Sequence, residues 1–299
     1  MSSIDRIAVI GSGTMGNGIA HVFAQHGFII HLVDTSPEAL KKGVDTIGKN
    51  LDRQIAKGAL QAADKARTLG NIKTFGAITE GVAGAGLIIE AATENADIKV
   101  AVFRELDLHA PAGAVLASNT SSISITRIAN ATRRPGQVIG MHFMNPVPLM
   151  KLVEVIRGYK TDSPTVETIM TLCTQIEKVP VEVNDYPGFV ANRILMPMIN
   201  EAIYALHEGV AGVKEIDTVM KLGMAHPMGP LQLADFIGLD VCLAILRVLH
   251  EGFGNPKYAP CPLLMNIVEA GHLGVKTGEG FYQYTRGSKE LVVSTALKC

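Results

Sequence analysis

Residues 7–27 read "IAVIGSGTMGNGIAHVFAQHG", and the pattern in this stretch predicts the fold of the first part of the chain. An apolar strand candidate leads directly into Gly11, Gly13 and Gly16 at G-x-G-x-x-G spacing, and a helix candidate follows. Gly11 permits the tight turn, Gly13 lets a pyrophosphate approach the main chain, and Gly16 allows close helix-to-strand packing. The helix start presents N–H groups and its positive dipole end to the anion. The predicted cofactor contacts of this loop are Gly11, Gly13, Thr14, Met15 and Gly16.

An acidic residue follows at the distance that this motif requires. The next strand candidate, residues 28–34, ends in Asp34, 18 residues after Gly16, where its carboxylate would accept both ribose hydroxyls of a dinucleotide. Its charge would repel a 2′-phosphate, and no arginine lies between Asp34 and Arg53 to neutralise one. We therefore predict NAD, in preference to NADP. The alternative is that Asp34 only caps the helix that begins near Pro37.

Up to about residue 185, short apolar runs alternate with longer helical stretches. The strand candidates are residues 6–10, 28–34, 86–92, 114–119, 137–143, 152–156 and 179–183. Such alternation predicts parallel strands joined by right-handed helical crossovers, hence a Rossmann-like, doubly wound α/β sheet. Residues 36–70 are charged and contain no proline after Pro37, which predicts a helical hairpin that projects from the sheet.

The pair Pro187-Gly188 marks a change along the chain, because residues 188 to about 274 contain no clear strand candidate. We predict two domains: an NAD-binding Rossmann-like domain over residues 1–186, and an all-α domain for substrate binding and dimerisation over residues 187–299. Pro197 is expected to kink the first helix of the second domain.

The composition is that of a globular protein that binds small molecules. Of 299 residues, 47% are hydrophobic and 18% are charged, and the net charge of −1 offers no basic field for nucleic acid or an anionic membrane. The N-terminus lacks a signal-peptide pattern, and no apolar run is long enough to span a membrane, so we expect a soluble, cytoplasmic protein. Cysteines 173, 242, 261 and 299 form no CxxC motif, which predicts free thiols and no metal site.

A histidine and a carboxylate stand in an apolar stretch, residues 140–156, "GMHFMNPVPLMKLVEVI". It contains His142 and, twelve positions on, Glu154. Burying an ionised carboxylate costs on the order of several kcal/mol unless a partner is in reach. Because Pro146 and Pro148 oppose a helix and favour a chain reversal, strands on either side could bring His142 and Glu154 level.

This pair predicts a general base. Glu154 would hold one ring nitrogen of His142 and stabilise the imidazolium, which leaves the other nitrogen to take or give a proton. Two alternatives stay open: a histidine in an apolar segment is often only a core residue, and the two side chains could form a purely structural pair.

Several motifs occur in one order along the chain. They are "GSGTMGNGIA" (11–20), "ASNTSS" (117–122), residues 140–156, "PGFVANRI" (187–194), "MKLGMAHPMGPLQLADFIGLD" (220–240) and "KTGEGFY" (276–282). Together they resemble the short-chain L-3-hydroxyacyl-CoA dehydrogenases, particularly bacterial 3-hydroxybutyryl-CoA dehydrogenases. The resemblance implies a homodimer that oxidises (S)-3-hydroxyacyl-CoA thioesters to 3-ketoacyl-CoA with NAD, and catalyses the reverse reduction.

The resemblance also implies roles for individual residues. His142 becomes the base in oxidation and the acid in reduction, with Glu154 as its orienting partner, and Ser121 and Asn192 lie near the reacting oxygen. From the residues alone, Ser121 could instead cap the helix that begins near Ser124, and Asn192 could be an ordinary polar helix residue. The implied residues on the nicotinamide side are Glu94, Lys99, Asn119, Ser121 and Lys276.

Three lysines have a simpler alternative. Lys99 and Lys276 could be solvated surface charges, and Lys57, which we expect to meet the phosphates of coenzyme A, could belong to a wet helix face. Met144 stands where many relatives have a second phenylalanine, a swap expected to reshape the acyl pocket without touching the chemistry.

Two other functions remain open. A β-hydroxyacid dehydrogenase would share the two-domain layout, but it typically uses a lysine acid-base group that "PGFVANRIL" lacks. A nucleotide-binding relative without turnover could keep the fold, although an unused buried titratable pair brings no obvious stability.

Overall fold

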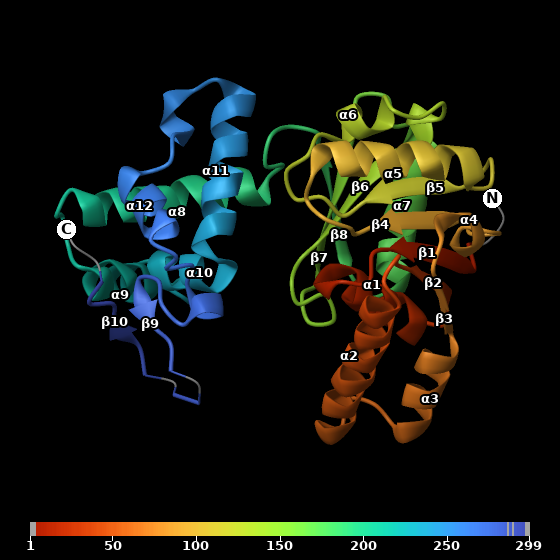
Figure 1. Cartoon of the computed structure of the whole chain (residues 1–299), viewed down its shortest axis with the longest axis horizontal. Coiled ribbons are helices and arrows are strands. Elements are labelled where there is room, and N and C mark those ends of the chain that lie inside the picture. The colour runs from red at the N-terminus through yellow and green to blue at the C-terminus, as the bar shows by residue number, and fades with distance from the viewer. Residues whose placement is uncertain (1–3, 286, 289, 297–299) are drawn as a thin grey trace. The chain divides into compact units, whose positions relative to one another are not determined.

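The structure, a computed structural model, describes residues 4–285, 287–288 and 290–296. The chain divides into two compact units, Met1–Tyr186 and Pro187–Cys299 (Figure 1). Within the described residues, no helix combines the length and apolar character that crossing a membrane requires.

The first unit is built on an eight-stranded sheet. Its strands are β1 (Arg6–Ile10), β2 (Ile29–Val33), β3 (Ile72–Phe75), β4 (Leu87–Glu90), β5 (Val115–Ser118), β6 (Val138–Phe143), β7 (Leu152–Arg157) and β8 (Val179–Asn184), in the order β3-β2-β1-β4-β5-β6-β7-β8. All neighbours are parallel except β6 and β7, which are antiparallel. The predicted Rossmann-like sheet is confirmed, and the chain reverses where Pro146 and Pro148 stand.

The sequence gives no sign of strand β3. This strand has four residues, none of them fully buried, and it lies at the edge of the sheet beside β2. Because an edge strand packs against a single neighbour, it needs little of the apolar pattern by which strands are recognised.

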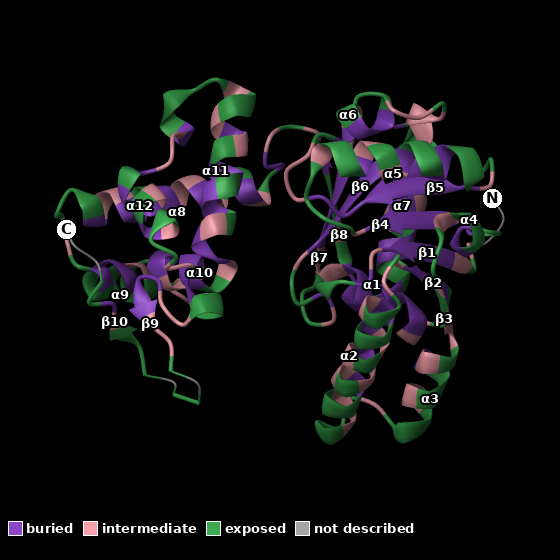
Figure 2. Ribbon diagram, in the orientation of Figure 1, coloured by how far each residue is buried: buried purple, intermediate pink, exposed green. Residues whose placement is uncertain are grey.

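Helices surround this sheet. They are α1 (Thr14–Gln25), α2 (Pro37–Ala56), α3 (Ala62–Gly70), α4 (Ile78–Gly81), α5 (Ala96–His109), α6 (Ile125–Ala129), the 3-10 turn η1 (Pro135–Gln137) and α7 (Ser163–Gln175). Helices α2 and α3 form the predicted hairpin, which extends away from the sheet (Figure 1). Helix α2 buries one stripe at Leu40, Gly43, Ile47 and Leu51, and its other residues are partly or fully exposed (Figure 2).

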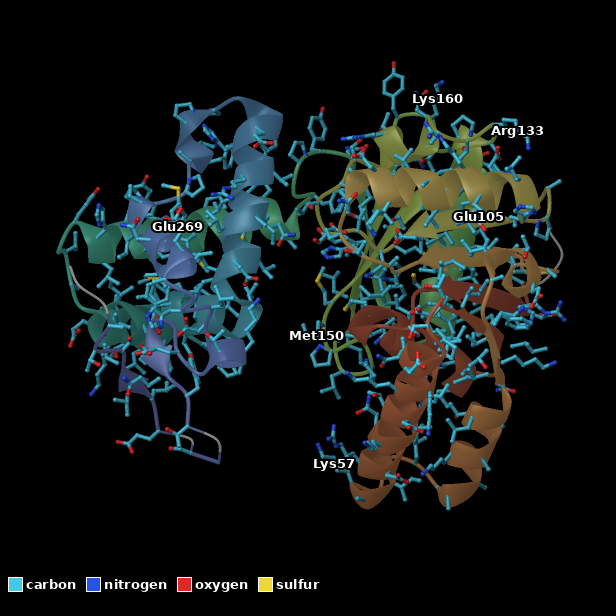
Figure 3. All side chains as sticks on the ribbon, in the orientation of Figure 1. Lys57, Glu105, Arg133, Met150, Lys160 and Glu269 are labelled. Atoms are coloured by element: carbon cyan, nitrogen blue, oxygen red, sulfur yellow. The ribbon has the colours of Figure 1, made fainter. Side chains whose placement is uncertain are left out.

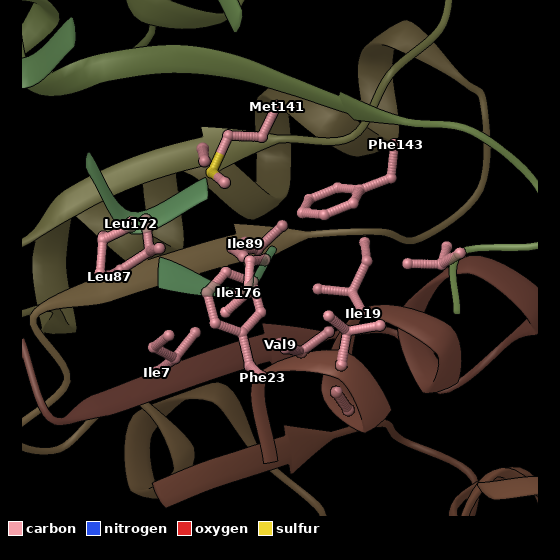
Figure 4. Close-up of a cluster of buried hydrophobic side chains, with 14 of the residues drawn as sticks. Ile7, Val9, Ile19, Phe23, Leu87, Ile89, Met141, Phe143, Leu172 and Ile176 are labelled. Atoms are coloured by element: carbon pink, nitrogen blue, oxygen red, sulfur yellow. The ribbon is translucent and has the colours of Figure 1, made fainter. Parts of the chain in front are cut away.

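One face of the sheet is covered by α1 and α7. Alternate residues of β1, such as Ile7 and Val9, point into this core, where Phe23 of α1 and Ile176 after α7 meet them (Figure 4). Phe143 of β6 belongs to the same cluster and is 1% exposed. The core therefore fixes β6, the strand that carries His142, against the helix that follows the glycine-rich loop.

The second unit is mainly helical, as predicted. Its elements are α8 (Ala191–His207), α9 (Val213–Gly223), α10 (Pro230–Ile237), α11 (Leu239–Phe253), η2 (Pro256–Tyr258), α12 (Pro262–Glu269), η3 (Val275–Thr277), β9 (Tyr282–Gln283) and β10 (Val292–Val293). The antiparallel pair of β9 and β10 is an addition that the all-α prediction lacks. Helix α8 is continuous through Pro197.

Three of the cysteines, Cys173, Cys242 and Cys261, are free, as predicted, and the structure shows that they are buried. Cys299 lies outside the described residues.

Candidate active site

The predicted site residues of the first unit converge on one edge of the sheet. Strands β1, β2, β4, β5 and β6 are mutually parallel, so their carboxyl ends lie on the same side. Gly11 follows β1, Asp34 follows β2, Glu94 follows β4 and Asn119 follows β5, and His142 is the penultimate residue of β6. In open α/β sheets, ligands bind at this edge.

The glycine-rich loop has the geometry of a phosphate cradle. Gly11 adopts φ 97°, a left-handed conformation that favours glycine, and its N–H donates to the carbonyl of Val33 at 2.8 Å. A Cβ at Gly16 would overlap the carbonyl oxygen of Gly11, whereas a Cβ at Gly13 would meet nothing within 4 Å. The loop packs tightly against its helix and stays open at Gly13, so these residues fit a dinucleotide pyrophosphate.

Asp34 is tied to this loop. Its Oδ2 accepts hydrogen bonds from the backbone N–H and the hydroxyl of Ser12, both at 2.8 Å. Burial opposes ionisation, yet these bonds, with one from the Ser36 N–H, lower the pKa of Asp34. The cap of α2 is Ser36, whose hydroxyl accepts from the Ala39 N–H at 3.1 Å, so the interpretation of Asp34 as only a helix cap is wrong. An ionised carboxylate beside the loop fits the ribose of NAD.

His142 and Glu154 face each other across the β6–β7 pair. They are register partners, and Nδ1 of His142 lies 2.8 Å from Oε2 of Glu154. The exposed fractions are 9% for His142 and 2% for Glu154. Because a carboxylate oxygen accepts, the ring donates Nδ1–H in this contact, and Nε2 is the acceptor whenever the ring is neutral. The predicted juxtaposition is confirmed, and its catalytic role stays a prediction.

Glu94 organises the loop that carries Ser121. Its Oε1 accepts from the Thr120 hydroxyl at 2.6 Å and from the backbone N–H groups of Ser121 and Ser122 at 2.9 and 3.1 Å. Burial opposes ionisation, but the charge of Lys99 and these bonds lower the pKa of Glu94. The predicted neighbours Glu94 and Ser121 are therefore in contact.

Other contacts define the two sides of this loop. Ser124, not Ser121, caps α6, because its hydroxyl accepts from the Arg127 N–H at 3.2 Å. Asn119 Oδ1 accepts from the Phe143 N–H at 2.9 Å and so joins the end of β5 to the residue after His142.

Lys99 is buried, so its interpretation as a solvated surface charge is wrong. Its ammonium is 1% exposed and lies 2.7 Å from Oε1 of Glu90 and 3.5 Å from Oε2 of Glu94. Sequence reasoning missed Glu90, which is fully buried at the end of β4 and also accepts from the Ser118 hydroxyl at 2.7 Å. The signal was present, because an acidic residue ends the apolar run "LIIE".

Of the remaining predicted residues, Lys57 belongs to the first unit, and Asn192 and Lys276 belong to the second. Lys57 is exposed and caps the far end of α2 (Figure 3). In the second unit, Asn192 is a buried residue at the start of α8. Lys276 is partly exposed and lies 2.5 Å from Asp240 Oδ1.

Comparison with known protein families gives a match in each of the two units. Residues 6–186 match the model of the 3-hydroxyacyl-CoA dehydrogenase NAD-binding domain, and residues 188–284 match that of the 3-hydroxyacyl-CoA dehydrogenase C-terminal domain.

Individual relatives give the same result. The chain is 52% identical to a probable 3-hydroxybutyryl-CoA dehydrogenase of Bacillus subtilis, over 94% of this chain and 98% of that protein. It is 52% identical to the 3-hydroxybutyryl-CoA dehydrogenase of Bradyrhizobium diazoefficiens, over 96% and 97% of the two chains. The crystal structure of (S)-3-hydroxybutyryl-CoA dehydrogenase from Ralstonia eutropha superposes with a TM-score of 0.92 at 49% identity, covering 95% of this chain and all of that one.

Proposed function

The chain belongs to the 3-hydroxyacyl-CoA dehydrogenase family, and on that premise we propose that it interconverts (S)-3-hydroxybutyryl-CoA and acetoacetyl-CoA with NAD. The observation that carries this proposal is a buried His142–Glu154 pair at the sheet edge where the glycine-rich loop ends. Family membership favours this function over the β-hydroxyacid dehydrogenase alternative.

In the oxidation direction, Nε2 of His142 removes the proton of the substrate 3-hydroxyl. The ring is prepared for this step because Glu154 holds Nδ1–H at 2.8 Å, fixes the tautomer and stabilises the positive charge that the ring gains. Bound NAD supplies the acceptor for the hydride that leaves C3. In the reverse direction, the same nitrogen donates its proton to the 3-keto oxygen of acetoacetyl-CoA.

The surroundings of the pair support this chemistry. His142 and Glu154 are both buried, and electrostatic interactions are stronger where water is excluded. We assign Ser121 and Asn192 as hydrogen-bond donors to the substrate oxygen, where they would stabilise the polarised C–O bond of the transition state. Ser121 is supported by its loop, which Glu94 holds at the same sheet edge.

The glycine-rich backbone would hold the pyrophosphate of the cofactor, and side chains would hold its ribose and its nicotinamide. Asp34 would bind the ribose hydroxyls, and the loop from Gly11 to Gly16 the pyrophosphate. On the nicotinamide side we retain Glu94, Asn119 and Ser121 as direct contacts. Lys99 is ion-paired with Glu90 and Glu94, so it would support the cofactor site by holding these carboxylates and would not contact NAD itself. Lys276 is assigned from family resemblance.

The test is an assay with purified protein. NADH absorbance at 340 nm should fall when acetoacetyl-CoA is added, and much more slowly with NADPH. A series of longer 3-ketoacyl-CoA thioesters would then give the preferred acyl length. Absence of turnover with every 3-ketoacyl-CoA would sink the proposal.

Two predictions concern the protein in solution and in the cell. A homodimer is expected, and light scattering coupled to gel filtration should give about twice the mass of one chain. We also propose a cytoplasmic location, which cell fractionation would check.

A further inference from the structure

A buried lysine lies just behind the β6–β7 reversal. Lys178 precedes β8 and is 7% exposed. Its ammonium donates to the carbonyl of Val147 at 2.6 Å and to the carbonyl of Met150 at 2.7 Å. The charge of Lys151 opposes its ionisation, and within the described part of the chain no carboxylate forms an ion pair with it. Burying an ammonium whose hydrogen bonds go to carbonyls, with no carboxylate beside it, lowers the stability of the folded protein, which suggests that Lys178 has a function.

The buried titratable side chains near Lys178 are neutral, so they contribute no charge that could balance its ammonium. Burial lowers the pKa of His21 to about 4 and raises the pKa of Cys173 to about 12, so both side chains are neutral near pH 7. Burial, and then the charge of Lys151, lower the pKa of Lys178 itself. Lys151 is exposed and lies in the loop that Lys178 holds.

The two carbonyls belong to the segment that joins His142 to Glu154. Residues 144–151 link β6 to β7, and within them the Pro146 carbonyl accepts from the Leu149 and Met150 N–H groups, both at 3.0 Å. On the opposite side, Val147 is 2% exposed and packs on α1 at Gly18, where a Cβ would lie 2.9 Å from the Val147 Cβ. The reversal is therefore held between the glycine of α1 and the ammonium of Lys178.

We propose that Lys178 is a positioning residue for the acid–base pair: by holding the Val147 and Met150 carbonyls, it keeps the β6–β7 reversal in the shape that sets His142 level with Glu154. The inference rests on the proposed function. Removing the ammonium leaves the Val147 and Met150 carbonyls without their donor, and the buried Val147 carbonyl can recover a hydrogen bond only if the reversal moves. Small displacements of an acid–base group weaken catalysis strongly, by about a hundredfold for about 1 Å.

The experiment compares Lys178→Met with Lys151→Met, a matched control that removes an exposed lysine from the same reversal. For each purified protein, kcat and KM with acetoacetyl-CoA, the NADH dissociation constant, the melting temperature and the pH–rate profile are measured. We expect Lys178→Met to lose about tenfold to a hundredfold in kcat with its NADH affinity retained, because the glycine-rich loop is untouched. The alkaline limb of its reduction profile should move to lower pH, because a looser Glu154 contact holds the donated proton less well. Lys151→Met should match wild type.

A third variant separates positioning from stability. Lys178→Arg keeps donors for the two carbonyls and should recover part of the lost kcat. If Lys178→Met folds and shows wild-type kcat and pH profile, or if both Lys178 variants fail to fold, the residue serves stability alone and the inference is overturned. Wild-type protein without activity on acetoacetyl-CoA would instead contradict the proposed function.

Discussion

The glycine-rich loop after β1 and the reversal between β6 and β7 meet at one edge of the sheet, yet they are built in opposite ways. The loop depends on the absence of side chains: the Gly11 carbonyl occupies the space that a Cβ at Gly16 would need, and the space beside Gly13 is open. The reversal works through side chains, the His142–Glu154 pair in front and Lys178 behind. One region is shaped for binding an anion and the other for moving a proton, so damage to each should have a separate signature.

The largest expected effect comes from the proton-transfer side. His142→Gln keeps the size and polarity of the side chain but cannot carry a proton between substrate and solvent. We expect kcat to fall by about 10²–10⁴-fold with the NADH dissociation constant unchanged, as measured by steady-state kinetics and NADH fluorescence. His109→Gln, at an exposed histidine of α5, is the control. An active His142→Gln would return His142 to a structural role.

The next effect breaks the loop instead. Gly16→Ala would force its Cβ against the Gly11 carbonyl, and overpacking of this kind costs about 1–3 kcal/mol. NADH should bind about tenfold to a hundredfold more weakly, while kcat at saturating NADH falls much less. Gly48→Ala, where a Cβ would meet nothing within 4 Å, should bind NADH normally. If Gly16→Ala and Gly48→Ala weaken NADH binding equally, the assignment of the glycine-rich loop as the phosphate site is wrong.

A smaller effect sharpens the loop's selectivity. Asp34→Asn removes the charge beside the ribose and leaves a side chain of the same size. The ratio of kcat/KM for NADH over NADPH should fall by about tenfold, because repulsion of the 2′-phosphate is lost. Asp45→Asn, on the exposed face of α2, should keep the wild-type ratio. An unchanged ratio in Asp34→Asn would remove Asp34 from cofactor selection.

The smallest effect concerns the tip of the helical hairpin. Lys57 is exposed, and exposed charge pairs contribute little. Lys57→Ala should raise KM for acetoacetyl-CoA by about twofold at low ionic strength, and the difference should vanish in about 1 M salt. Lys41→Ala, another exposed lysine of α2, provides the comparison. If the two variants behave alike, Lys57 is an ordinary solvated residue.

The two regions also differ in how far the sequence predicts them. The cradle is local: its glycines, strand and helix are contiguous, so the spacing predicts both the turn and Asp34 at the next strand end. The His142–Glu154 contact joins residues twelve apart, and it was predictable because two prolines mark the reversal.

Contacts that no local sequence signal marks were out of reach. Lys99 of α5 meets Glu90 at the end of β4, and Lys178 reaches the reversal from the start of β8, the strand beside β7. A lysine in a sequence is ordinarily solvated, and only folding shows that these two are buried. Strand β3 was missed because a strand at the edge of the sheet does not need a strongly apolar sequence.

The most direct test of the acid–base account is a double-mutant cycle on kcat/KM for acetoacetyl-CoA reduction with His142→Gln, Glu154→Gln and the double variant. If Glu154 acts through His142, each single substitution lowers kcat/KM and the double variant is no slower than His142→Gln alone. The NADH dissociation constant stays at its wild-type value throughout. Losses that multiply in the double variant would show that the two residues act independently and would contradict the account.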